Sequence, residues 1–174
     1  YSVDHQVAEI SESSINNYLS RSPIIGQNSI LYRTLEDGST KINYIVVDNF
    51  YGDITEDGIN YLIGLNVNGY QVELELDTKF SEIKDNNTLV FSTDNLYFGN
   101  DLATDSMKEF FFKVLNTSFS KSSTMQISIN EKEVSFRFDN AINDSPNKDL
   151  IASKTLSAGF DKDTNDGVML IYAN

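Results

Sequence analysis

Residues 61–80 read YLIGLNVNGYQVELELDTKF and carry the clearest structural signal in the chain. Asn68-Gly69 stands between two runs rich in apolar residues, and this pair suits a two-residue type I′ turn because both central residues need a positive φ. From Tyr70 to Phe80, apolar residues alternate with charged and polar ones, Thr78 standing in the apolar series. The pattern predicts an antiparallel hairpin of 61–67 and 70–80, with one face buried and the other in water.

The same period of two recurs on both sides of this hairpin, and two helical patterns interrupt it. The first predicted helix covers 10–19, where Ser11 can cap the first turn, and the second covers 103–119. Further strands are predicted over 30–35, 41–50, 88–98, 125–129 and 134–139, and in a final pair, 150–160 with 168–173. We therefore expect an α+β fold: a large curved antiparallel sheet packed on one central helix, with a short N-terminal helix.

The length of 174 residues, 40% of them hydrophobic, fits one domain with its own core. The chain shows no internal repeat and no linker-like stretch, so a single domain is predicted over 1–174. Residues 1–9 are mostly polar and are expected to form a loose lead-in.

The charge balance is strongly acidic, with a formal net charge of −13. Such a chain repels phosphate backbones, so nucleic-acid binding is not expected. The chain has no cysteine, which excludes thiol chemistry and fits the oxidising exterior of a cell.

Catalytic motifs give little support to an enzyme. The lone histidine, His5, lies in the polar N-terminal segment, and no phosphate-binding glycine loop occurs. Three acids, Glu73, Glu75 and Asp77, fall on the solvent-facing side of a predicted strand. We therefore interpret them as solvated surface residues rather than as the source of a catalytic carboxylate pair. Residues 161–167 fit a hairpin turn better than a calcium loop. We predict a protein that is not an enzyme and has no cofactor and no metal.

The predicted helix 103–119 carries one apolar stripe at helical spacing that should dock on the sheet. Its members are Met107, Phe110, Phe111, Val114, Leu115 and Ser118. Phe112 lies outside this stripe, and Phe119 falls one heptad later on the same flank. A strand edge or the first helix can cover this flank, contacts between copies can do so, or the flank lines a groove for an apolar ligand or partner. On the last interpretation Phe112, Phe119 and Tyr97 are the candidate ligand-binding residues.

Several segments together resemble the YpmS-like proteins of Gram-positive bacteria. They are residues 15–19, 86–91, 96–99, 110–115 and 129–136, together with the end of the last hairpin, 168–172. The resemblance implies a small extracytoplasmic domain, tethered to the membrane by an N-terminal segment that is absent from this chain. The family has no settled biochemical activity, so the resemblance implies no catalytic residue.

Three functions remain open at this stage. The first is a non-enzymatic extracytoplasmic binding domain for a lipid or another apolar ligand. The second is a protein–protein interaction or scaffold module at the cell envelope, which uses a sheet edge or the acidic face. The third is a hydrolase that acts through carboxylates, which needs two acids facing each other in a cleft. The sequence does not indicate an oligomeric state.

Overall fold

The computed structural model describes residues 5–119, 127–138, 146, 148–149, 154–163 and 166–174. In these ranges the chain has a mixed α+β fold made mostly of antiparallel strands, which agrees with the predicted class. The helices are α1 (Glu12–Ser20) and α2 (Asp105–Phe119). No helix within the described ranges combines the length and the apolar character that crossing a membrane requires.

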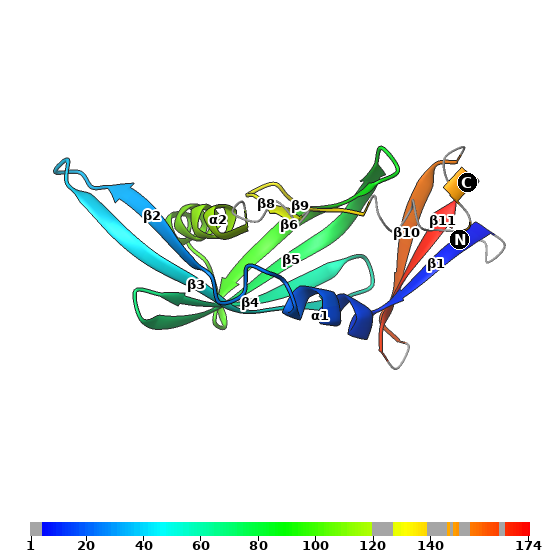
Figure 1. Ribbon diagram of the computed structural model, residues 1–174, viewed down its shortest axis with the longest axis horizontal. Helices are drawn as coiled ribbons and strands as arrows, with labels where there is room; N and C mark the ends of the chain where they lie inside the picture. Colours follow the sequence, from blue (N-terminus) through cyan, green and yellow to red (C-terminus); the bar gives the residue numbers. More distant parts are fainter. Residues whose placement is uncertain (1–4, 120–126, 139–145, 147, 150–153, 164–165) are drawn as a thin grey trace.

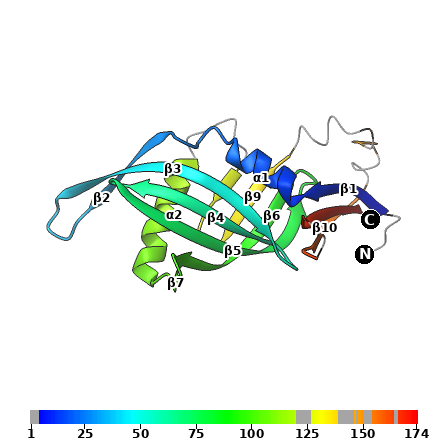
Figure 2. The ribbon, with the colours of Figure 1, turned by 90° about the horizontal axis from the view of Figure 1, so that it is seen from below.

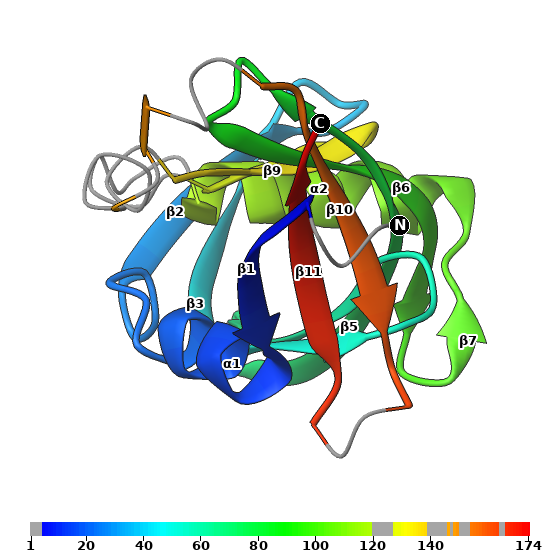
Figure 3. The same cartoon turned by 90° about the vertical axis from the view of Figure 1, so that its right-hand side faces the viewer.

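The larger sheet has eight strands and curls into a trough (Figure 1, Figure 3). In spatial order it contains β2 (Asn28–Thr34), β3 (Thr40–Ile54), β4 (Ile59–Val67), β5 (Tyr70–Lys84), β6 (Thr88–Phe98), β9 (Glu133–Arg137) and β8 (Ile127–Ile129), with β7 (Asp101–Leu102) beside β6. Helix α2 lies in the trough, where it contacts β2, β3 and β8.

The Asn-Gly hairpin is confirmed as β4 and β5. Val67 pairs with Tyr70, and the two turn residues Asn68 and Gly69 have φ values of 54° and 90°. Alternate residues of β5 from Val72 to Thr78 are buried, as the sequence pattern predicts. Turn chemistry and alternation are local properties, so they place this hairpin without knowledge of the rest of the fold.

The expectation of a loose lead-in over residues 1–9 is wrong, because a second sheet, of three strands, includes part of this segment. Its order is β1 (Gln6–Ser11), β11 (Val168–Ala173) and β10 (Leu156–Asp161), so residues from Gln6 onward form a strand. The polar composition of 1–9 hid this strand because its stability comes from pairing with β11, more than 150 residues away in sequence, where Ile10 faces Met169. Figure 3 shows the small sheet crossing one end of the trough.

Helix α1 covers the free edge of β3. Ser11 caps the helix as predicted, since its hydroxyl accepts a hydrogen bond from the Ser14 backbone N–H at 3.1 Å. Strand β2 pairs with β3 only as far as Val46. Beyond that point, the Asn16 side chain accepts a hydrogen bond from the Gly52 N–H at 2.7 Å, and the Glu12 carboxylate accepts one from the Ile54 N–H at 2.8 Å. Side chains of α1 thus bind the backbone groups that a neighbouring strand would otherwise bind.

Candidate functional site

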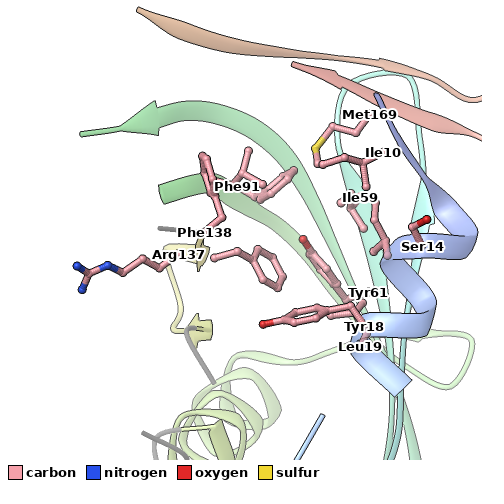
Figure 4. A pocket seen from close by; sticks show the side chains of 13 residues that line it. Ile10, Ser14, Tyr18, Leu19, Ile59, Tyr61, Phe91, Arg137, Phe138 and Met169 are labelled. Carbon is pink, nitrogen blue, oxygen red and sulfur yellow. The ribbon is translucent and has the colours of Figure 1, made fainter. Parts of the chain in front are cut away.

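A cavity of about 440 Å³ lies where α1, the small sheet and the inner face of the large sheet meet (Figure 4). Its walls come from segments at both ends of the chain and from its middle. The lining residues are Ile10, Ser14, Ile15, Tyr18, Leu19, Ile59, Tyr61, Leu89, Phe91, Phe136, Arg137, Phe138 and Met169. Its volume falls in the range of small-molecule sites, ~300–1,000 Å³.

The lining is apolar inside and polar at the solvent side. Leu19, Tyr61 and Phe91 are at most 1% exposed and form the inner wall. Ser14, Tyr18 and Arg137 are exposed and supply a hydroxyl, a phenol and a guanidinium group. An apolar interior with a few polar groups is the usual composition of a site for an apolar ligand.

Tyr61 is the centre of the inner wall. Its ring packs against Phe50, Phe91 and Phe136, with centroid separations of 5.9, 6.3 and 5.7 Å. The hydroxyl is buried and has no hydrogen-bond partner among the described residues. An unsatisfied buried polar group costs ~1–3 kcal/mol. Burial also raises the pKa of the Tyr61 hydroxyl, so the group is a neutral phenol.

The predicted ligand-binding residues lie elsewhere and apart from one another. Phe112 is 8% exposed and lines a separate hollow of about 360 Å³ between α2, β2 and the β8–β9 turn. Phe119 is 1% exposed and packs edge-on against Phe50 in the core, at a centroid separation of 5.1 Å. Tyr97 is half-buried on β6, opposite Glu75 of β5. None of the three is among the residues that line the 440 Å³ cavity.

Sequence reasoning did not single out Tyr61, Tyr18 or Met169 as site residues. One signal for Tyr61 was present, because it begins the alternating series Tyr61, Ile63, Leu65 that faces the core. A tyrosine at such a position brings a hydroxyl into an apolar interior, where it needs a partner. No local signal indicated that Tyr18 and Met169 line one cavity, since this depends on how α1 and β11 are placed in the fold.

The carboxylates of β5 form a pair outside the cavity. Glu75 and Asp77 are half-buried on the outer face of the strand, and neither lines the cavity or the hollow beside Phe112. Burial, and then the neighbouring Glu75 carboxyl group, raise the pKa of Asp77 to about 7. Among the described residues, no group of three or more acids and histidines is placed to hold a metal ion. The carboxylate hydrolase stays a prediction, which the position of Glu75 and Asp77 outside the cavity and outside the hollow beside Phe112 does not support.

The raised pKa of Asp77 makes the free energy of unfolding depend on pH. The folded protein holds its proton more tightly than the unfolded chain, where the pKa is near 3.8. The contribution of Asp77 to stability therefore falls as pH rises from about 4 to about 7. We expect Asp77→Asn to stabilise the protein at pH 8 by ~1–2 kcal/mol, after allowance for solvent screening, and to leave it nearly unchanged at pH 4.

Urea unfolding of both proteins at pH 4 and pH 8 measures this difference. The matched control is Glu73→Gln, an exposed acid on the same face of β5, for which we expect no pH-dependent gain. An equal effect of Asp77→Asn at the two pH values would contradict the prediction.

The segment predicted as a turn or a weak cation site, 161–167, lies partly outside the described residues. In the part that is described, the Asp161 carboxylate accepts a hydrogen bond from the Asp163 N–H at 2.9 Å, and Gly167 has a φ of 52°. Both features are typical of a turn. They agree with the interpretation as the β10–β11 connection.

Comparisons with known proteins leave the site to be interpreted from its geometry. No protein-family model, no curated protein and no solved structure matches this chain.

Proposed function

We propose that this protein binds a lipid or another apolar ligand in the cavity between α1, the small sheet and the trough of the large sheet. The cavity itself carries the proposal. Its volume of 440 Å³ is comparable to that of two other hollows, about 360 and 460 Å³, but its wall consists mostly of aromatic and aliphatic side chains, whereas charged residues border the other two. Burial of an apolar ligand there stabilises the complex by ~25 cal/mol per Å² of apolar surface removed from water.

The proposal keeps the ligand class expected from the sequence and changes the place of the site. The expected groove ran along the Phe112 and Phe119 flank of α2. Phe119 is covered by core residues, and the hollow beside Phe112 is bordered by Glu109, Lys113 and Glu131, whose charges suit an apolar chain poorly. The cavity near Tyr61 offers the larger apolar wall.

We propose a non-enzymatic role outside the cytoplasm, at the envelope of a Gram-positive cell, with a membrane tether. The cysteine-free composition supports that location. We also propose that α2 is the single central helix on which the large sheet packs, a role supported by its buried Phe111, Val114 and Leu115.

A hydrocarbon probe tests the binding function. Diphenylhexatriene has no polar atom and fluoresces on entering an apolar site, so we expect saturable one-site binding to the purified protein. Ile10→Trp replaces an aliphatic side chain on the lining of the cavity by a bulkier indole ring and should weaken binding by about tenfold or more, where tenfold corresponds to ~1.4 kcal/mol. Fluorescence titration measures both affinities.

The matched control is Tyr44→Trp. Tyr44 is 60% exposed on β3 and does not line the cavity, so this variant should bind the probe as the wild type does. Circular dichroism and the melting temperature establish that both variants are folded. Lack of saturable binding by the wild type would refute the function, and full binding by Ile10→Trp would place the site elsewhere.

One observation favours the interaction module as a second candidate. The β2–β3 hairpin extends beyond the rest of the trough (Figure 2). One of its faces carries two cross-strand pairs of exposed apolar side chains, Ile30 with Tyr44 and Tyr32 with Ile42. If the wild type takes up no probe, self-association in sedimentation experiments that is weakened by Tyr32→Glu would favour this candidate.

A further inference from the structure

The Tyr61 hydroxyl, which has no hydrogen-bond partner among the described residues, indicates which polar group the ligand carries. Among the described residues, three buried side-chain atoms lack a hydrogen-bond partner: the Tyr61 hydroxyl, Asp77 Oδ1 and Ser118 Oγ. Only Tyr61 belongs to the lining of the apolar cavity. The fold satisfies other buried polar groups, as where the Thr78 hydroxyl donates to the Ile59 carbonyl at 2.6 Å. The unsatisfied group therefore coincides with the place where a ligand would bind.

The surroundings of this hydroxyl disfavour a charged group beside it, because the cation of the lining, the Arg137 guanidinium, is exposed at the solvent side. Its ring is enclosed by Phe50, Phe91 and Phe136, and Tyr61 is 0% exposed. An ionised group brought to this depth would lose its hydration without a buried counter-charge, whereas a neutral oxygen loses far less. A neutral phenol donates one hydrogen bond and accepts others, so it suits an ester carbonyl or an alcohol.

We propose that the ligand is a neutral lipid whose ester carbonyl or hydroxyl oxygen forms a hydrogen bond with the Tyr61 hydroxyl. This inference rests on the proposed function, the binding of an apolar ligand in the cavity. The hydrocarbon part of the ligand contacts Ile10, Phe138 and Met169, which face the same space (Figure 4). At ~30 Å³ for a group the size of a water molecule, 440 Å³ holds on the order of fifteen non-hydrogen atoms. A twelve-carbon acyl ester matches that number.

A ligand atom reaches the Tyr61 hydroxyl only when the side chains that cover it move. The hydroxyl oxygen has less than 1 Å² of exposed surface, so the lining covers it. Tyr18 extends from α1 into the same cavity and is 55% exposed (Figure 4). Exposed side chains change rotamer within nanoseconds. Rotation of an exposed lining side chain such as Tyr18 is therefore a motion that can widen the cavity without disturbing the sheet.

The experiment compares Tyr61→Phe with the wild type, using methyl laurate to displace diphenylhexatriene. The substitution removes one oxygen and keeps the ring, so the hydrocarbon probe should bind both proteins within twofold. We expect methyl laurate to bind the variant about 5- to 10-fold more weakly, the effect of one hydrogen bond in an apolar site. We also expect laurate, the charged acid of the same chain length, to bind the wild type more weakly than the ester at pH 8.

Each contrary outcome has a distinct meaning. If both proteins bind the probe and methyl laurate equally well, Tyr61 does not recognise the ligand, while the apolar site stands. If laurate binds more tightly than the ester, the ligand is an acid and the neutral class is wrong. If the wild type binds no probe, the proposed function fails, and this inference fails with it. Tyr44→Phe removes a hydroxyl from an exposed tyrosine and should alter none of these affinities.

Discussion

Phe119→Ala should cost about 3–5 kcal/mol of folding free energy, the usual range for truncating a fully buried phenylalanine. Phe119 is 1% exposed at the end of α2, and its ring meets Phe50 edge-on at a centroid separation of 5.1 Å. Domains are stable by only ~5–15 kcal/mol, so this one change removes a large share of the total. Urea unfolding with an unchanged m-value measures the loss.

Phe98→Ala is the control for this prediction. Phe98 also packs on α2, stacked on Phe111 with 5.6 Å between ring centroids, yet it is 36% exposed. Its truncation should cost only about 1 kcal/mol. If the two variants lose the same stability, Phe119 is not the core residue that its burial indicates, and its predicted place in a ligand site regains support.

Gly58→Ala should destabilise the protein by about 3 kcal/mol, at the upper end of the cost of overpacking. A Cβ atom at Gly58 would stand 2.5 Å from the Thr78 carbonyl oxygen and 2.9 Å from the Lys79 Cα. Both are backbone atoms of β5 and cannot rotate away, so β4 and β5 must separate. The expected fall in melting temperature is ~6–12 °C for a domain of this size.

The same variant should weaken uptake of the hydrocarbon probe, because Gly58 lies one residue before Ile59 and three before Tyr61, and both of these line the cavity. Gly38→Ala is the matched glycine control. Gly38 has a φ of 84°, and an added Cβ would meet no atom within 4 Å, so backbone strain of ~1–2 kcal/mol is its only cost. An equal loss in the two variants would show that β4 and β5 have room to adjust at Gly58.

The sequence by itself determined the elements whose signals are local. Asn68-Gly69 determined the central hairpin through positive φ values, and Ser11 was correctly expected to cap α1, although the predicted helix began at residue 10, which lies in β1. Alternation along β5 named the buried face correctly from Val72 to Thr78. Each of these rests on interactions within a few residues, so the letters of the sequence are enough to find them.

The site needed the tertiary structure. Phe112 and Phe119 looked alike on a helical projection, and both belong to the buried core, yet Phe112 also borders the hollow beside α2, whereas Phe119 packs on Phe50. No periodicity could indicate which strand or ring would cover each of them. Burial on a helix flank depends on the shape of the partner element, and that shape comes from distant parts of the chain.

The cavity is the clearest case. Ile10 and Met169 are paired across β1 and β11, and both line the same cavity as Tyr61 from the middle of the chain. The sequence determined that these residues are apolar or aromatic and that each belongs to a regular element. Only the tertiary structure decided that they leave a space and that the Tyr61 hydroxyl lacks a partner, because packing voids and unmet hydrogen bonds arise from the joint fit of several elements.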